Sequence, residues 1–301
     1  TAIGKSALTN QNFTSATDSH NTAVGFHSGL AITTGTYNTL LGGLSGDALT
    51  DADFNTALGY GTLSSDTLGS KSVAIGSKAL FTQNFTSATD AYNVAIGVNA
   101  GQLVTTGVEN VLIGGLAGDA LTTGSGNVAL GTEALSAEDA HGKNTAIGHQ
   151  ALLVQNAGAD AYNVAVGFQS GKAITTGVQN TFIGGLSGDA NTTASDNTAV
   201  GYLSLSANTT GASNTAVGQS ALGGNTTGTR NTALGRTALQ TNTEGNDNTS
   251  AGYFSMYKNT TGGLNTAFGS SALEENTTGA NNLALGYNAL EENTTASNNT
   301  A

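Results

Sequence analysis

The sequence predicts an all-β fold, a parallel β-solenoid with coils of about 17 residues, and three observations lead to it. A five-residue motif, Asn-(Thr/Val)-Ala-apolar-Gly, recurs through all 301 residues. Its glycines are mostly 17 residues apart, which is too short for a helix pair, because helical repeats need more than about 30 residues. The chain also contains no Pro, and a strand that is paired on both sides cannot lose a backbone N–H.

The repeat divides the chain into 17 units with few insertions. The motif glycine stands at positions 4, 25, 42, 59, 76, 97, 114, 131, 148, 167, 184, 201, 218, 235, 252, 269 and 286. Thirteen of the 16 gaps are 17 residues, two are 21 and one is 19, and the long gaps hold three insertions, Gln11–Asp18, Gln83–Asp90 and Gln155–Asp160. We therefore expect one β-solenoid segment over residues 1–301, with three four-coil blocks of about 72 residues in 1–200 and plain 17-residue coils in 201–301.

Both ends of the sequence fall inside the repeat. Thr1 follows the place of a motif Asn, and Asn299-Thr300-Ala301 begins a further copy. Solenoids need capping units with a polar outer face at free ends, and the sequence contains no divergent unit of this kind. We expect the chain to be a segment of a longer protein.

The alternation of the motif residues predicts which face of each strand is buried. The residue before the Gly is apolar in all 17 units, and the residue two positions earlier is usually Thr or Val. Since side chains alternate along a strand, we expect these two to point into the coil and the intervening Ala to lie on the opposite face. A face of Ala and Gly lacks bulk and favours the close approach of another backbone. The sequence therefore predicts a packing face between chains, made by Ala23, Leu40, Leu112, Phe182, Ala216 and Ala233.

Turns and further core positions follow the strand in each unit. An Ala-Leu pair three and four residues after the Gly, as at Ala221-Leu222, predicts a second inward patch. Asn precedes the strand in 15 of the 16 units that contain the position, and stacked Asn side chains can form amide ladders. Thr-Thr-Gly, as at Thr226-Thr227-Gly228, predicts the other corner. Each coil has only two or three inward residues, so we expect the coils to be stable only when they stack.

Composition narrows the class of partner. The formal net charge is −12, with 8 Lys and Arg against 20 Asp and Glu, which argues against nucleic acid and anionic membranes. The chain has no Cys for a disulfide or a thiolate metal site. It also lacks an apolar run near the roughly 20 residues of a membrane span. We expect no cofactor, no nucleic-acid partner and no membrane insertion in this segment.

Two stretches resemble repeats of known families. Ser72-Val73-Ala74-Ile75-Gly76-Ser77-Lys78-Ala79-Leu80 is similar to the head repeat of YadA-like trimeric autotransporter adhesins. The plain coils, with the pattern Asn-Thr-Ala-Val-Gly-x-x-Ala-Leu-x-x-Asn-Thr-Thr-Gly, also resemble repeats of phage tail-fibre-like proteins. The adhesin resemblance implies a left-handed β-roll with three chains packed around a threefold axis. The 17-residue units and four-coil blocks depart from the adhesin pattern, so bacterial adhesin and phage fibre both stay open.

These features together predict a structural role. We expect an extracellular fibre or adhesin segment without enzymatic activity, at a cell surface or on a virion. It would form a homotrimeric shaft that binds a cell-surface glycan or protein receptor. Weak contacts that repeat along three chains would then add through effective concentration. No nucleophile, base and orienting acid recur together, so we assign no catalytic residue.

The insertions are the candidate receptor-contact loops, because extra residues in one solenoid turn must bulge outward. The residues that this reasoning singles out are Asn12, Phe13, Thr14, Asn84, Phe85 and Thr86. Two interpretations stay open for Phe13 and Phe85. They are either exposed aromatics that bind a partner or local caps that fold back over the coil.

Acidic and histidine residues give weaker signals. Gly42-Gly43-Leu44-Ser45-Gly46-Asp47-Ala48-Leu49 faintly resembles a calcium-binding nonapeptide, but one Gly is displaced and one Asp per block supplies too few oxygens. We expect a turn with an exposed Asp47, and the same for its copies Asp119 and Asp189. The pairs Glu274-Glu275 and Glu291-Glu292 predict a solvated edge that keeps rods apart, with cation binding as the alternative. The four His follow no metal spacing, so we assign no metal ligand.

Rows of Thr provide an alternative function. Regular Thr ladders on flat solenoid faces can bind ice, and Thr pairs recur here at 105–106, 209–210, 226–227 and 260–261. These pairs stand at a corner, which is a poor plane. An ice-binding or other ladder-surface binding solenoid therefore stays as the alternative to a fibre.

Overall fold

The computed structural model describes all 301 residues and confirms the all-β prediction. The chain is a parallel β-solenoid of about 17 turns. It divides into two compact units: unit 1 comprises Thr1–His149 with Gly158–Asp160, and unit 2 comprises Gln150–Ala157 with Ala161–Ala301. None of its elements is a helix long and apolar enough to cross a membrane.

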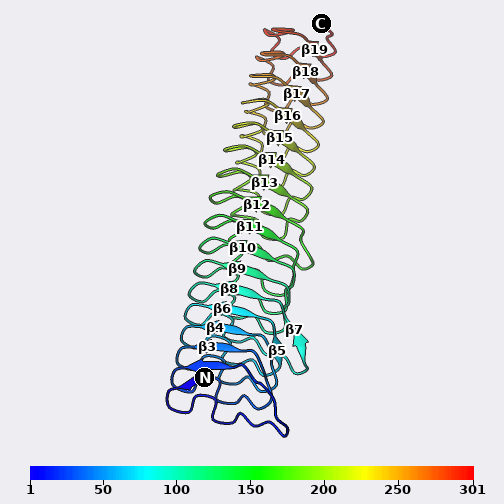
Figure 1. Cartoon of the computed structure of the whole chain (residues 1–301). Coiled ribbons are helices and arrows are strands. Elements are labelled where there is room, and N and C mark those ends of the chain that lie inside the picture. The colour runs from blue at the N-terminus through cyan, green and yellow to red at the C-terminus, as the bar shows by residue number, and fades with distance from the viewer. The chain divides into compact units, whose positions relative to one another are not determined.

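Unit 1 stacks one short parallel strand per coil (Figure 1). In spatial order these strands are β1 (Ala2–Ile3), β2 (Thr22–Val24), β3 (Thr39–Leu41), β4 (Thr56–Leu58), β6 (Val73–Ile75), β8 (Val94–Ile96), β9 (Val111–Ile113), β10 (Val128–Leu130) and β11 (Thr145–Ile147). A separate two-stranded sheet pairs β5 (Gly69–Ser70) with β7 (Thr89–Asp90). This small sheet ties the second insertion to the coil before it.

Unit 2 repeats the same arrangement. Its strands are β12 (Val164–Val166), β13 (Thr181–Ile183), β14 (Thr198–Val200), β15 (Thr215–Val217), β16 (Thr232–Leu234), β17 (Thr249–Ala251), β18 (Thr266–Phe268) and β19 (Leu283–Leu285). Neighbours pair in parallel with a 17-residue offset, as in Thr215 with Thr232, which confirms the predicted coil length. The corners pair too, since Thr226 N donates to Thr243 O at 3.0 Å. Each coil therefore satisfies its backbone through its neighbours.

The structure reverses the predicted orientation of the strands. Ala23, Ala216 and Ala233 are fully buried inside a single chain, whereas Val217, the residue before a motif Gly, is 39% exposed. The predicted packing face between chains was therefore wrong for all six residues, because the bulky members of the set are also fully buried inside their own coils: Leu40, Leu112 and Phe182. The reason is the width of the coil. Side chains from the opposite turn fill the interior, so a methyl group suffices at the centre of most strands.

Glycine in the opposite turn makes room wherever the strand centre is bulky. The residue four positions after the motif Gly is Leu in 10 of the 17 units, and eight of these Leu are buried. Beside Phe182 it is Gly188, and a Cβ there would lie 2.6 Å from Phe182 Cζ. Beside Leu40 it is Gly29, where a Cβ would lie 2.9 Å from Leu40 Cδ1. A large strand residue and a small turn residue thus fill one interior volume, as close packing requires.

The motif glycines form a row that no other residue could replace. Gly25 has a φ of +140°, and a Cβ on it would collide with the carbonyl oxygen of Gly42 in the next coil. The same contact recurs from Gly218 to Gly235. The motif therefore requires Gly for two reasons, a backbone conformation that L side chains rarely adopt and a close approach between coils.

Two ladders of Asn amides run through the interior. In the strand ladder, which the sequence predicts, Asn38 Nδ2 donates to Ala52 O at 2.7 Å and Asn38 N donates to Asn21 Oδ1 at 2.8 Å. The second, which we name the corner ladder, comprises Asn191, Asn208, Asn225, Asn242, Asn259, Asn276 and Asn293. There Asn225 Nδ2 donates to Asn208 Oδ1 at 2.8 Å and to Gly228 O at 3.0 Å. Both ladders hydrogen-bond buried polar groups, as a stable interior requires.

Candidate functional site

The surface of the chain has no pocket. Candidate sites are therefore loops, side-chain clusters and flat faces. They comprise the predicted insertions, the coils that precede the insertions, and the outward side of the strands.

The predicted loop residues divide into exposed and covered ones. Asn12, Thr14, Asn84 and Thr86 are exposed, whereas Phe13 is half-buried. Phe85 is only 5% exposed and lies against the preceding coil, where a Cβ on Gly69 would come within 2.7 Å of Phe85 Cδ2. Phe85 is thus a cap over the coil. The accessible part of the second insertion is polar.

The first two blocks end in a buried acid that sequence reasoning missed, whereas the third has Asn208 at this position. Asp66 and Glu138 occupy the position that the corner ladder takes in the plain coils, and both are fully buried. We name the coil end at Asp66, and its equivalent at Glu138, the block junctions. An alignment of the units at 17 residues shows an acid where the plain coils carry Asn, and this signal could have identified the junctions.

Asp66 anchors the second insertion through hydrogen bonds. Gln83 Nε2 donates to Asp66 Oδ2 at 2.6 Å. The backbone N–H groups of Gly69 and Phe85 donate to Oδ1 at 3.1 Å and 3.3 Å. Burial raises the pKa of Asp66, and the hydrogen bonds from these donors partly offset that rise. Gln83, Gly69 and Phe85 all donate to the carboxylate, so both oxygens of Asp66 act as hydrogen-bond acceptors.

A Lys–Asp pair closes the insertion at each junction from outside. Lys71 Nζ lies 2.6 Å from Asp90 Oδ2, and Lys143 Nζ lies 2.6 Å from Asp160 Oδ2. The hydrogen bond to Asp90 raises the pKa of Lys71, and the hydrogen bond from Lys143 lowers the pKa of Asp160. Both pairs are exposed to solvent, so they position the loops more than they stabilise the fold.

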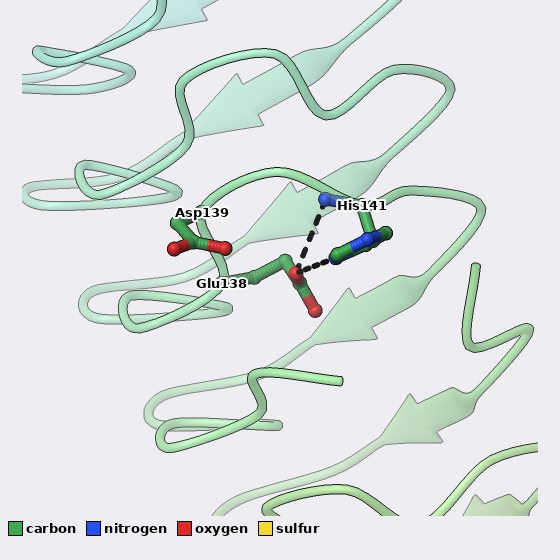
Figure 2. A group of neighbouring side chains, drawn as sticks. All are labelled: Glu138, Asp139 and His141. Atoms are coloured by element: carbon green, nitrogen blue, oxygen red, sulfur yellow. Dashed lines mark hydrogen bonds and ion pairs between the residues drawn. The ribbon is translucent and has the colours of Figure 1, made fainter. Parts of the chain in front are cut away.

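The second junction also groups three residues that could act as metal ligands (Figure 2). Ligand atoms of Glu138, Asp139 and His141 lie within 4.8 Å of one another, with Glu138 buried and Asp139 exposed. Glu138 Oε1 accepts the backbone N–H of His141 at 3.3 Å and lies 3.8 Å from His141 Nδ1. Asp66 makes the same bond to the N–H of Gly69, where no His is present. The corner geometry of the junction therefore accounts for the grouping.

The Asp of the Gly-Gly-Leu segments lies in the stack. Asp47, Asp119 and Asp189 are half-buried and not exposed as the sequence predicts. The reason is contact with the next coil, because Ser64 Oγ donates to Asp47 Oδ1 at 2.7 Å and Ser136 Oγ donates to Asp119 Oδ1 at 2.7 Å. Burial raises the pKa of Asp189. These carboxylates are used by coil-to-coil hydrogen bonds at two of the three copies.

The acidic edge contains one cation of its own. Lys258 Nζ donates to Glu275 Oε2 at 2.7 Å, one coil away, and this hydrogen bond raises the pKa of Lys258. Glu274 and Glu291 are half-buried and Glu292 is exposed. The edge is therefore a partly paired and solvated surface.

The outward side of the strands is an apolar surface in both units. We define the outer face as the row of residues that precede the motif glycines. In unit 1 these are Ile3, Val24, Leu41, Leu58, Ile75, Ile96, Ile113, Leu130 and Ile147. In unit 2 they are Val166, Ile183, Val200, Val217, Leu234, Ala251, Phe268 and Leu285. All are exposed or half-buried, and none is charged.

Exposed aromatic residues extend this apolar surface. Several coils carry an aromatic residue two positions after the outer-face residue, and each is about half exposed. These are Phe26 and Tyr60 in unit 1 and Phe168 and Tyr202 in unit 2. A separate stack joins His20, Tyr37 and Phe54 in successive coils of unit 1, with ring centroids 5.0 Å and 4.9 Å apart. Tyr37 stacks on both of its neighbours, and Tyr37 and Phe54 are each about half exposed. Sequence reasoning missed both groups, although the 17-residue spacing places them in register.

At the Thr corner, the first Thr of each pair donates its hydroxyl group to a backbone carbonyl of the next coil. Thr209 Oγ1 donates to Thr226 O at 3.1 Å, and Thr226 Oγ1 donates to Thr243 O at 2.9 Å. The second Thr of each pair, such as Thr210, is exposed. A second Thr row lies on the outward side of the strands, where β14, β15 and β16 begin with Thr198, Thr215 and Thr232.

Comparison with known proteins adds no relative to this description. No protein-family model matches the chain, and no curated protein sequence matches it.

Proposed function

We propose that the chain is a segment of an extracellular fibre or surface adhesin, in which copies of the chain pack side by side through the outer face. One observation carries this proposal. A soluble chain rarely exposes a long apolar row, and such a surface marks a site of association. In unit 2, Ile183, Val217, Leu234 and Phe268 are all about 40% exposed.

The periodicity of the outer face favours a second copy of this chain as its occupant. The face repeats with one apolar residue per 17-residue coil, a step of about 4.8 Å between paired strands. A partner must match this step over many coils, and a parallel copy matches it by construction. Because the face carries no charge, copies meet without desolvating an ion.

Three chains and a left-handed coil are part of the proposal. The resemblance of Ser72–Leu80 to the adhesin head repeat supports both. In such a trimer the outer faces lie around the central axis, and the polar insertions with Asn84 and Thr86 lie away from it. The insertions then serve as receptor contacts, and the coils serve as a shaft without enzymatic activity.

Sedimentation of the full chain tests this function. We expect a species of three times 29.7 kDa for the wild type. Val217→Glu places a charge on the outer face and should give a folded monomer, because Val217 is outside the core. Thr210→Glu adds the same charge at an exposed corner and should leave the assembly intact. A wild-type chain that stays monomeric at high concentration would refute the proposal.

Ice binding is the second candidate, and the outward Thr row favours it. Thr198, Thr215 and Thr232 pair in register one coil apart on the parallel sheet, next to the apolar row. The same surface cannot bind ice and pack against another chain. A monomer with thermal hysteresis that Thr215→Glu abolishes would support ice binding, and a trimer without hysteresis would exclude it.

A further inference from the structure

The corner ladder coincides with a modification motif that the fold cannot accommodate. Asn-x-(Ser/Thr) is the acceptor motif for N-glycosylation, and such acceptors normally lie in surface loops. In this sequence the motif begins at Asn12, Asn84, Asn191, Asn208, Asn225, Asn248, Asn259, Asn276, Asn293 and Asn298. Six of these are buried in unit 2: Asn191, Asn208, Asn225, Asn248, Asn259 and Asn276.

In five of the six buried residues both amide protons are engaged in hydrogen bonds, and Asn191 Nδ2 donates one bond, to Ala194 O at 3.1 Å. An Asn side chain carries two N–H donors. Asn208 Nδ2 donates to Asn191 Oδ1 at 3.1 Å and to Gly211 O at 2.9 Å. Asn276 Nδ2 donates to Asn259 Oδ1 at 2.8 Å and to Gly279 O at 3.0 Å. Asn248, in the strand ladder, likewise donates to two oxygens.

Glycan transfer to one of these residues removes a ladder bond. The reaction forms a bond from Nδ2 to C1 of the sugar, breaks the bond from C1 to the lipid-linked diphosphate oxygen, and releases one amide proton. In Asn208, Asn225, Asn248, Asn259 and Asn276 the proton that is lost is one of the two that Nδ2 donates. The sugar would also have to occupy the coil interior, where the side chain has no exposed surface.

We propose that this chain folds in a compartment that does not transfer oligosaccharides to asparagine, and that its folded form offers N-glycan acceptors only outside the buried ladders. Within the insertions these acceptors are Asn12 and Asn84, which are exposed. Near the C-terminal end Asn298 is exposed and Asn293 is half-buried. Glycosylating enzymes act on unfolded chains, so the six buried sites are modified before the coils close and then prevent their closing. The proposal does not depend on the fibre function.

A variant without the six buried motifs gives a matched comparison. Five of the motifs are completed by an exposed Thr, namely Thr193, Thr210, Thr227, Thr261 and Thr278. Their replacement by Ala removes the motif and leaves the ladder Asn in place. Ser250 completes the sixth and stands at the strand centre, where most coils have Ala, so Ser250→Ala restores the common residue.

The experiment expresses the full chain and the six-substitution variant, each with a secretion signal, in yeast. We expect loss of secreted folded wild type, with glycans on ladder Asn in the retained fraction by mass spectrometry. The variant should be secreted and carry glycans only at the exposed and half-buried sites. Both chains should fold equally when made in bacterial cytoplasm, and tunicamycin should restore the folded wild type in yeast.

Three results would overturn the proposal. The first is secreted, protease-resistant wild type with glycans on ladder Asn. The second is secreted wild type with these Asn unmodified. The third is retention of the six-substitution variant in yeast despite normal folding in bacterial cytoplasm, since the ladder glycans would then not be the cause.

Discussion

The side-chain amide of Gln83 and the buried carboxylate of Asp66 meet at 2.6 Å across one coil step. Gln83 also accepts, through Oε1, the Nδ2 donor of Asn93 at 2.9 Å. One Gln therefore connects the acid of a finished block with the strand ladder of the next block. The insertion between Gln83 and Asn93 is held at its root by these polar contacts, in addition to the buried ring of Phe85.

Replacement of Asp66 by Asn should destabilise the fold at neutral pH. Gln83 Nε2, Gly69 N and Phe85 N all donate to the carboxylate, so an amide NH₂ would face donors. We expect a loss of about 1–3 kcal/mol in the free energy of unfolding, the usual penalty for an unsatisfied buried group. Urea unfolding measures it, and Asp196→Asn at an exposed site is the neutral control. Equal stability of Asp66→Asn and wild type would contradict this account.

The pH dependence of the same pair of proteins has a defined sign. Burial raises the pKa of Asp66 above 3.8, so the folded chain holds this proton to higher pH than the unfolded chain. Stability of the wild type relative to Asp66→Asn should therefore be highest below pH 3.8 and should fall as pH rises through the raised pKa. Unfolding series at several pH values measure this difference. A difference that grows with rising pH would show a lowered pKa instead.

Gly188→Ala should be among the most damaging small substitutions. The residue has a φ of +58°, and a Cβ would lie 2.6 Å from Phe182 Cζ. Overpacking and the left-handed backbone together predict a loss of roughly 2–4 kcal/mol. Gly158→Ala is the control, because a Cβ there meets no atom within 4 Å. Phe182→Ala in the Gly188→Ala background should lose less than the sum of the two single changes, as expected for residues that share one volume.

Ala216→Glu should prevent folding of the single chain. Ala216 is fully buried at the centre of β15, so the variant places an unpaired charge in the coil interior. Circular dichroism should show loss of β-structure for Ala216→Glu and its retention for Val217→Glu, the adjacent outer-face variant. The opposite pattern would restore the orientation that the sequence predicts.

Asn225→Ala tests the corner ladder. The substitution removes the donor to Asn208 Oδ1 and the acceptor of Asn242 Nδ2, whereas Gly228 O keeps Asn214 Nδ2 as a donor. We expect a loss of roughly 1–3 kcal/mol, because the buried Asn208 Oδ1 is left without its donor. Asn156→Ala, at an exposed insertion residue, should change the unfolding midpoint little. If both variants unfold alike, the ladder contributes little to stability.

The repeat spacing was sufficient to predict the coil, the parallel pairing and the strand ladder. A 17-residue period fixes the register, because each motif residue must pair with its own copy, as Thr215 does with Thr232. The Asn before the strand and the Gly after it follow from the backbone conformation and close approach that the coil needs. These features depend on local chemistry that is repeated in every unit.

The orientation of the strand and the nature of the junctions could not be predicted in the same way. Alternation separates the two faces of a strand but does not say which face is inside. Val is larger and more apolar than Ala, so the sequence favours Val as the core residue. Ala is the inward residue because Leu222 and its equivalents already fill the coil. Leu222 itself has a φ of +49°, a conformation that its residue type does not suggest. Asp66 and Glu138 were likewise hidden, because a buried acid is explained only by the donors that surround it.

The closed contact between Gly218 and Gly235 has a consequence for how such a chain changes in length. In the plain coils each motif residue contacts its equivalent one unit away. An extra unit therefore offers the same motif residues to the coil before it and to the coil after it. Duplication or deletion of a stretch such as 214–230 keeps the Asn, strand and Gly contacts in register, and of the ion pairs only that between Arg230 and Asp247 is lost on deletion. The length of the plain-coil part can therefore change in steps of one whole coil. Between Asp66 and Gln83 the order of coils is fixed, because the two partners differ.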